Sequence, residues 1–139
     1  CSGGTAQQAL EEATAYVQER RQFDTAIADF QATQFKLADM LTELVAARQM
    51  VRLAASKLDS QDSQASTYCA MAKRFATDAG FNICNDALQL YGGYGYIKEY
   101  PMERHVRDTR VHQILEGTNE IMRVIVSLYS LMDGSFCVF

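Results

Sequence analysis

Apolar side chains recur at steps of three and four residues along most of the chain, which is the pattern of amphipathic helices. In the first stretch, about residues 5–20, the apolar positions are Ala6, Leu10, Ala13 and Val17. The second stretch, about residues 29–58, has a longer stripe: Phe30, Thr33, Leu37, Leu41, Leu44, Val51, Ala55 and Leu58. Asp29 has a side chain suited to capping this second helix. The pattern predicts two helices, the second about 40–45 Å long at roughly 1.5 Å per residue.

A third helix is predicted over about residues 64–91, after the polar turn of residues 59–63. Its apolar positions are Tyr68, Ala72, Phe75, Ala79, Ile83, Ala87 and Leu90. Gly92 and Gly93 end this helix, because glycine adopts the left-handed conformation that many helix C-termini need. Residues 94–100 are dense in tyrosine and glycine, and we expect them to form a loop.

Two shorter helices are predicted in the C-terminal part. Pro101 suits the first turn of a helix over about residues 101–114, since its missing N–H would be unpaired there. The last helix, from Thr118 to about Leu131, has one apolar face: Ile121, Ile125, Leu128 and Met132. This order of helices predicts an all-α fold, an antiparallel four-helix bundle with a short extra helix. We expect the bundle to span residues 1–132 and residues 133–139 to be an unassigned tail.

Composition and charge exclude several classes of partner. The chain has 139 residues, of which 48% are hydrophobic and 22% charged, which suits one globular domain. A formal charge of −4 and a pI near 5.1 argue against a nucleic-acid or anionic-membrane surface, which needs a concentrated basic field. No apolar run approaches the roughly 18 residues of a membrane span. The first residue is Cys1 rather than methionine, which indicates a piece of a longer chain.

Cysteine and histidine spacing gives no sign of a metal site. The four cysteines are Cys1, Cys69, Cys84 and Cys137, and none forms a CxxC pair. We expect reduced thiols, as in the cytosol or an organelle matrix. His105 and His112 lie on one helix face, but the sequence offers no further converging ligands, so packing roles are expected for both.

The clearest candidate for chemistry is Glu116, on the turn predicted between the last two helices. The apolar residues up to Leu115 indicate a buried approach to this acid. Gly117 allows backbone angles that a residue with a Cβ resists, and Thr118 can cap the following helix. The carboxylate would then project from a rigid corner. An acid near a helix start is also commonly a solvated residue stabilised by the helix dipole, and both interpretations fit the sequence.

Two other groups fit either a ligand-binding or a structural role. Gln89, Gly92 and Gly93 form a plain helix C-cap, or they expose bare backbone that admits a flat or phosphate-bearing ligand. Arg20 is a solvent-exposed base, or its guanidinium makes a bidentate contact with a diphosphate. Local sequence leaves these alternatives open.

Three groups of motifs occur in a fixed order over about residues 5–127. The first group is YVQERRQF (residues 16–23), IADFQ (27–31) and LADM (37–40). The second is QLYGGYGY (89–96), and the third is RDTR (107–110) with EGTNEI (116–121). This ordered set resembles the C-terminal helical domain of the acyl-CoA dehydrogenase family. Within the family, the segments ICN (83–85), GYGY (93–96) and VHQIL (111–115) resemble most the isobutyryl-CoA dehydrogenases.

The resemblance implies an FAD-dependent enzyme that dehydrogenates a short or branched acyl-CoA to the trans-2-enoyl-CoA. Glu116 matches the family's catalytic base, which removes the α-proton while the β-hydrogen leaves as hydride to flavin N5. Gly117 then lies at the substrate. An electron-transferring flavoprotein is the implied electron acceptor, and the implied locations are the bacterial cytoplasm or the mitochondrial matrix. Asp24 and Ala26 replace a glycine and a proline that the family commonly has after the first motif.

The same resemblance implies which residues bind FAD. The matching positions are Arg20, Gln22, Gln31, Gln89, Gly92, Gly93, Thr118 and Glu120. In the family one FAD is shared across a dimer interface, and residues 89–93 approach it from the neighbouring subunit. A homo-oligomer, a dimer of dimers, is therefore expected.

Two rival functions fit the same helices. An acyl-CoA oxidase would share the chemistry but pass electrons to oxygen. A non-catalytic helical scaffold would use the bundle for oligomerisation only. The family's N-terminal helical and central β domains have no counterpart in this chain, so we expect little or no activity from the chain alone.

Overall fold

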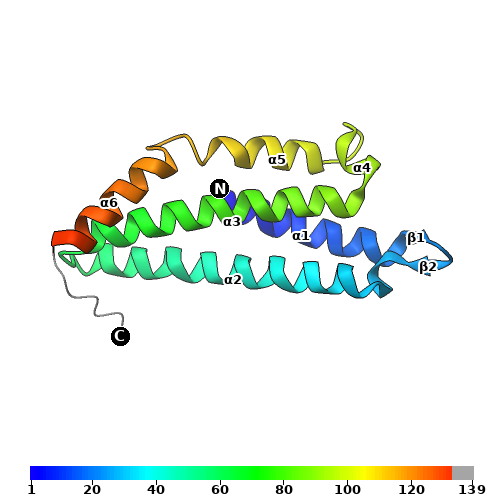
Figure 1. Cartoon of the computed structure of the whole chain (residues 1–139), viewed down its shortest axis with the longest axis horizontal. Helices are drawn as coiled ribbons and strands as arrows, with labels where there is room; N and C mark the ends of the chain where they lie inside the picture. Colours follow the sequence, from blue (N-terminus) through cyan, green and yellow to red (C-terminus); the bar gives the residue numbers. More distant parts are fainter. Residues whose placement is uncertain (133–139) are drawn as a thin grey trace.

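The computed structural model describes residues 1–132, and within them the chain forms six α-helices and one short hairpin (Figure 1). The helices are α1 (Ser2–Glu19), α2 (Gln31–Asp59), α3 (Ala65–Tyr91), α4 (Gly93–Tyr96), α5 (Met102–Val111) and α6 (Asn119–Met132). Strands β1 (Arg21–Gln22) and β2 (Thr25–Ala26) precede the 3₁₀ turn η1 (Ile27–Asp29). The predicted helical bundle is confirmed, and the predicted tail, residues 133–139, lies outside the described residues.

Helix α3 is the centre of the bundle and contacts α1, α2, α5 and α6. Figure 1 shows α2 running antiparallel along one side of α3 and α5 lying on the other side. Helix α6 slopes from the end of α5 toward the α2–α3 turn, and the hairpin extends from the opposite end of the bundle (Figure 1). Within residues 1–132, no helix has the length and apolar character to cross a bilayer.

Small side chains make the contact between α1 and α3 close. All four predicted apolar positions of the first helix are buried, which confirms its stripe. The core cluster consists of Ala6, Ala9, Leu10, Ala13, Met40, Leu44, Ile83, Cys84, Ala87, Tyr91 and Met102. At Gly80 a Cβ would lie 3.1 Å from the Cβ of Ser2, so the two helix backbones approach closely there. Dense packing of this kind tolerates few volume changes.

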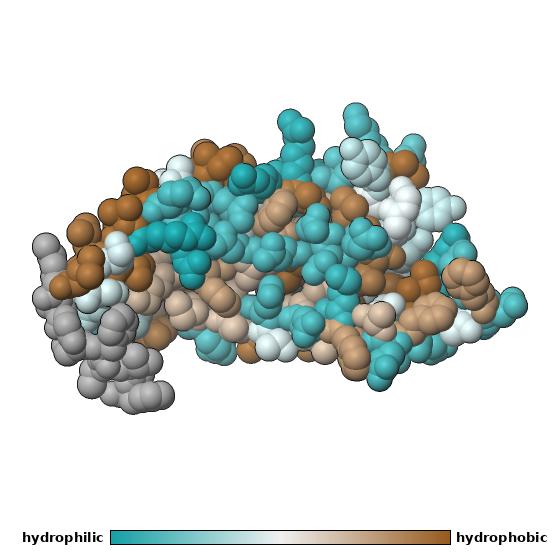
Figure 2. Space-filling model, in the orientation of Figure 1, coloured by the Kyte–Doolittle hydropathy of each residue, from teal (hydrophilic) through white to brown (hydrophobic). Residues whose placement is uncertain are grey.

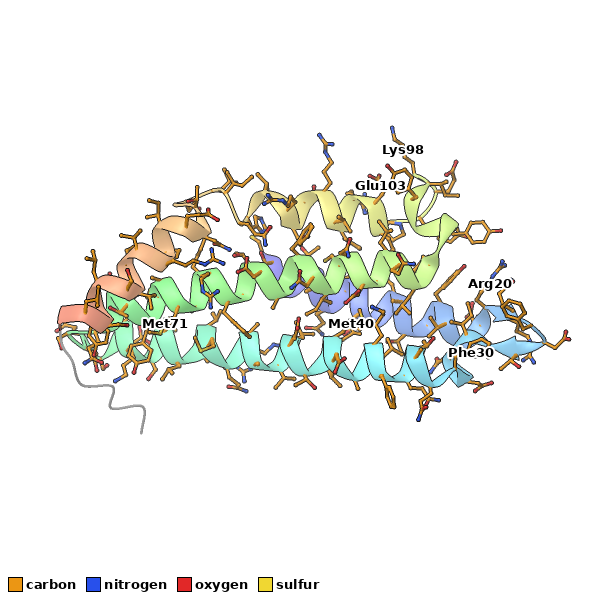
Figure 3. The ribbon with its side chains drawn as sticks, viewed as in Figure 1. Arg20, Phe30, Met40, Met71, Lys98 and Glu103 are labelled. Carbon is orange, nitrogen blue, oxygen red and sulfur yellow. The ribbon has the colours of Figure 1, made fainter. Side chains whose placement is uncertain are left out.

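Helix α2 buries only part of the predicted stripe: Thr33 and Leu44 are buried, and Leu37 packs partly buried against the core. Its buried residues are Thr33, Met40, Leu44, Ala47 and Ala54. Five predicted members of the stripe are exposed instead: Phe30, Leu41, Val51, Ala55 and Leu58. Figure 3 shows Met40 on the side of α2 that faces the other helices. The helix has apolar residues on two faces, and packing against α1 and α3 selects one, which periodicity alone does not reveal.

Two local predictions were wrong, and a third boundary is shifted by one residue. Residues 93–96 form the short helix α4 rather than loop, because Gly95, without a Cβ, packs against the carbonyl of Leu88. Asp29 does not cap α2: it lies in η1, and Phe30 occupies the N-cap position without a side-chain hydrogen bond. Pro101 lies at the start of α5, as predicted, since its carbonyl accepts the N–H of His105 at 3.1 Å; it is the N-cap, and the helix itself begins at Met102.

A short hairpin connects α1 to η1, with two residues in each strand and two in the loop. The sequence did not predict it. Arg21 pairs with Ala26, and Gln22 with Thr25. The two residues at its tip, Phe23 and Asp24, have φ values of +54° and +61°. Two positive φ values in a two-residue loop are the geometry of the tight turn that matches strand twist.

Candidate functional site

Glu116 lies on a tight corner between α5 and α6, as predicted. The N–H groups of Ile114 and Leu115 donate to the carbonyl of Val111 at 2.9 and 3.0 Å and close the end of α5. Glu116 and Gly117 then follow with φ values of +56° and +89°. A positive φ is costly for a residue with a Cβ, so Glu116 occupies an uncommon backbone conformation.

Thr118 begins the next helix in the predicted manner. Its Oγ1 accepts a hydrogen bond from the N–H of Ile121 at 3.4 Å, which confirms the expected cap. The predicted buried approach to Glu116 is wrong within this chain, because Ile114 and Leu115 are each 51% exposed and Glu116 is exposed. Residues 1–132 alone therefore do not bury the acid.

A cavity of about 590 Å³ lies beside the Glu116 corner. The start of α1, α2, α3 and the end of α5 line it, and Glu116 forms part of its wall. Ser2 and His112 are among the lining residues, and Ser2 Oγ lies 2.6 Å from His112 Nδ1. A ligand in this cavity would meet the carboxylate of Glu116.

Lys73 and Asn119, which the sequence analysis did not single out, tie the corner to α3. Lys73 Nζ donates to the carbonyl of Gly117 and to Asn119 Oδ1, each at 2.7 Å. Asn119 is 3% exposed, and its N–H donates to the carbonyl of Gln113 at 3.0 Å. Nothing in the local sequence marks Lys73, because its partners lie more than forty residues away in the chain.

Five of the eight predicted cofactor-binding residues line a second cavity, of about 570 Å³. These are Arg20, Gln22, Gln89, Gly92 and Gly93. Arg20 ends α1, and Gly92, with φ +58°, ends α3. Figure 3 shows Arg20 at the end of the bundle that carries the hairpin. The structure therefore brings together two segments that the sequence separates by almost seventy residues.

The remaining three predicted cofactor residues lie elsewhere. Gln31 is exposed at the first position of α2 and does not line the second cavity. Thr118 and Glu120 lie at the start of α6, where Glu120 pairs with Arg123 at 3.7 Å. The two cavities share no lining residue, so one chain does not place Glu116 within the Arg20 cavity.

The second cavity has the chemistry of an anion site with an aromatic wall. It combines the guanidinium of Arg20 with the side-chain amides of Gln22 and Gln89. A Cβ added at Gly92 or Gly93 would meet no atom within 4 Å, so the backbone there faces open space. A diphosphate ester fits this set, since a guanidinium is its usual donor in proteins and the two side-chain amides add further N–H groups.

The histidines pack between helices, as expected from their spacing. His105 Nε2 lies 3.4 Å from Glu12 Oε2 and joins α5 to α1, and His112 contacts Ser2. Across residues 1–132, no three His, Cys, Asp or Glu side chains converge as metal ligands. Cys1, Cys69 and Cys84 are free thiols, and Cys137 lies outside the described residues.

These features define a helical-bundle domain that carries the Glu116 carboxylate on a corner of two positive-φ residues and has a separate cavity, lined by Arg20, at one end. The family model for the acyl-CoA dehydrogenase C-terminal domain matches residues 1–128. The chain therefore belongs to the acyl-CoA dehydrogenase family, which confirms the resemblance drawn from its motifs.

Relatives with known names agree with this assignment. The chain is 54% identical over 127 residues to mitochondrial isobutyryl-CoA dehydrogenase of Dictyostelium discoideum, covering 91% of this chain and 30% of that protein. It is 51% identical over 133 residues to mitochondrial isobutyryl-CoA dehydrogenase of Bos taurus, covering 96% and 32%. The chain thus spans about a third of the length of these relatives.

Solved structures share the fold. A chain in the structure of an electron transferring flavoprotein of Acidaminococcus fermentans superposes with a TM-score of 0.91 at 43% identity, covering 95% of this chain and 34% of that one. Butyryl-CoA dehydrogenase from Megasphaera elsdenii gives a TM-score of 0.90 at 40% identity, covering 94% and 34%. The FAD complex of PigA gives a TM-score of 0.87 at 29% identity, and the match covers 92% of this chain and 33% of that chain.

Proposed function

We propose that this chain is the C-terminal domain of an FAD-dependent acyl-CoA dehydrogenase that converts a short or branched acyl-CoA to the 2-enoyl-CoA, which is the trans isomer when the β-carbon carries a further carbon. The observation that carries the proposal is Glu116, held on a corner of two positive-φ residues at the wall of the 590 Å³ cavity. Isobutyryl-CoA is the favoured substrate, because two relatives at 51–54% identity carry that name.

Glu116 acts as the base that removes the α-proton of the thioester. This proton is only weakly acidic, so the carboxylate must be held against it in a defined geometry. The N–H of Glu116 has no acceptor among residues 1–132, and it is free to donate to the thioester oxygen as negative charge develops there. Gly117 has no side chain, so the substrate can approach the backbone closely there.

Bound FAD would supply the acceptor for the β-hydride. Arg20, Gln22 and Gln89 would hold its diphosphate by hydrogen bonds, with Gly92 and Gly93 giving close access to the backbone. Gln31, Thr118 and Glu120 are proposed to contact its adenosine part. The structure of the PigA relative, an FAD complex, supports this choice of cofactor.

The separation of the two cavities supports a shared site. Arg20 and residues 89–93 line one cavity, and Glu116 lines the other. One chain would therefore offer Arg20 and residues 89–93 to one FAD and Glu116 to another. A homo-oligomer, proposed as a dimer of dimers, would complete each site from two copies. An electron-transferring flavoprotein is the proposed acceptor, and the mitochondrial matrix or bacterial cytoplasm the proposed location. The chain alone would show little or no turnover.

The test is an anaerobic titration of the full-length protein with isobutyryl-CoA and with a straight-chain acyl-CoA, followed by flavin absorbance. Bleaching by either thioester is expected in the wild type. Glu116→Gln should retain flavin and lose bleaching, whereas the control Glu99→Gln, an exposed acid of the α4–α5 connection, should bleach normally. Bleaching by Glu116→Gln at the wild-type rate would contradict the base assignment.

Two further outcomes distinguish the rival functions. Rapid reoxidation of the reduced flavin by oxygen would indicate an acyl-CoA oxidase. A full-length protein that binds no flavin would instead be a helical scaffold.

A further inference from the structure

The carboxylate of Glu116 is positioned by its backbone rather than by partners of its own. Among residues 1–132, no side chain or N–H hydrogen-bonds or ion-pairs with it. Its direction therefore depends on the two positive φ values of the corner, +56° at Glu116 and +89° at Gly117. Such a corner persists only when surrounding contacts hold it, because the extended and right-handed conformations are lower in energy for Glu116.

One of these contacts is the ammonium of Lys73. Its two hydrogen bonds, to the carbonyl of Gly117 and to Asn119 Oδ1, flank the corner on its C-terminal side. The donor is charged, so each bond is stronger than one between neutral groups. Lys73 also lines the 590 Å³ cavity with Glu116.

Asn119 supplies the second contact, from inside the protein. Its Nδ2 donates to Asp78 Oδ1 at 2.7 Å and to Thr77 Oγ1 at 2.9 Å, both on α3. With its N–H bound to Gln113, this buried residue joins the ends of α5 and α6 to α3. Gln113 Nε2 donates to the same oxygen of Asp78 at 2.8 Å, so the network closes on itself.

We propose that Lys73 and Asn119 are positioning residues for the reaction: they fix the Glu116–Gly117 corner on α3 and so hold the carboxylate at the substrate. The inference rests on the proposed function, in which Glu116 is the base. Neither residue needs to touch the substrate or the flavin, because both act through the carbonyl and the backbone of the corner.

The test uses the full-length holoenzyme with Lys73→Met, which keeps length and helix propensity but removes the donor. We expect turnover to fall by about 10- to 100-fold, the size of effect that a displacement of about 1 Å causes. Flavin content should stay near wild type, because the residues proposed to hold FAD are unchanged, and the loss should fall on kcat more than on KM, because Lys73 is proposed to act through the corner. The rate at which the thioester α-proton exchanges with solvent deuterium, followed by NMR, should fall in parallel with turnover.

Lys36→Met is the matched control. Lys36 Nζ also makes a 2.7 Å contact between helices, from α2 to Asp86 Oδ1 on α3, but it lies on neither cavity. The Lys36→Met variant should show the turnover and the rate of α-proton exchange of the wild type. The glutamine of Lys73→Gln is too short to bridge both acceptors, so this variant should lose as much turnover and α-proton exchange as Lys73→Met. It replaces Lys73→Met in the test if that variant folds poorly.

The outcomes distinguish a failure of the positioning role from a failure of the proposed function. Wild-type turnover and exchange in both Lys73 variants, with an inactive Glu116→Gln, would overturn the positioning role and leave the proposed function intact. Full activity in Glu116→Gln would overturn the proposed function itself. Loss in the Lys36→Met control equal to that in Lys73→Met would show that any lost helix contact has this effect, and would also overturn the inference.

Discussion

The guanidinium carbon of Arg20 lies 5.2 Å from the centroid of the Tyr94 ring. This contact joins the end of α1 to α4 at the edge of the 570 Å³ cavity. Tyr94 packs in turn on Tyr100, with ring centroids 5.3 Å apart, and Tyr16 stacks on Tyr91 at 4.0 Å. The ring of Tyr94, itself packed on Tyr100, thus contacts the arginine that the proposed diphosphate contact requires.

Replacing Tyr94 tests this arrangement. Tyr94→Leu removes the ring face and should weaken flavin retention by about two- to fivefold, because an exposed cation–π contact contributes roughly 0.5–1 kcal/mol. Tyr94→Phe keeps the ring face and should retain flavin as the wild type does. Flavin content after gel filtration and a fluorescence titration of the apoprotein measure both. Tyr96→Leu, at an 80% exposed tyrosine, is the control, and equal loss there would contradict the role of Tyr94.

The glycines of α4 should separate folding from cofactor binding. A Cβ at Gly95 would lie 2.5 Å from the carbonyl of Leu88, and this backbone atom cannot easily move aside. Gly95→Ala should therefore destabilise the protein by about 1–3 kcal/mol, the usual cost of overpacking. Gly93→Ala meets no atom within 4 Å and should leave the thermal midpoint unchanged while weakening flavin binding. A thermal melt and a flavin titration distinguish the two; equal midpoints for both variants would refute the packing argument.

At Gly117 we expect both strain and crowding. An alanine there would adopt φ near +89°, which costs about 1–2 kcal/mol, and its Cβ would lie 2.6 Å from Cε of Met122. Gly117→Ala should therefore lower turnover while flavin binding persists. The double variant Gly117→Ala/Met122→Ala relieves the contact but not the strain, so it should recover only part of the turnover. Complete recovery would show that φ at Gly117 is unimportant.

Cys84 makes stability fall at alkaline pH. Burial raises the pKa of this thiol to about 11, an effect that a hydrogen bond with Thr109 partly opposes. An unfolded thiol ionises near pH 8.5, so the unfolded state loses its proton first as pH rises. The free energy of unfolding therefore falls between about pH 8.5 and 11, by roughly 1.4 kcal/mol per pH unit at most.

The measurement for Cys84 is the thermal midpoint from pH 7 to 11 in the wild type and in Cys84→Ala. Cys84→Ala should be less stable at pH 7, because it leaves a small cavity, and should lose stability less steeply above pH 9. Burial also raises the pKa of Tyr16 and Tyr91, whose contributions are common to both proteins and cancel in the difference. Parallel pH profiles would contradict the prediction.

The sequence determined what depends on neighbours in the chain. The third helix and its end at Gly92 follow from local periodicity and the conformational freedom of glycine, and both are found as predicted. The corner at Glu116 and Gly117 and its cap by Thr118 are also local, since each involves residues within a few positions of one another. The ordered motifs were enough to identify the family, which the match over residues 1–128 confirms.

The tertiary structure decided what depends on contacts between distant segments. Met40 rather than Leu41 is buried, because α1 and α3 select one of two apolar faces of α2. Arg20 and Gln89 line one cavity because the ends of α1 and α3 meet, while Glu116 lies beside another. The hydrogen bonds of Lys73 reach the Glu116 corner only once α3 packs against α6. Such contacts depend on the folded arrangement of helices, and no local pattern in the sequence encodes them.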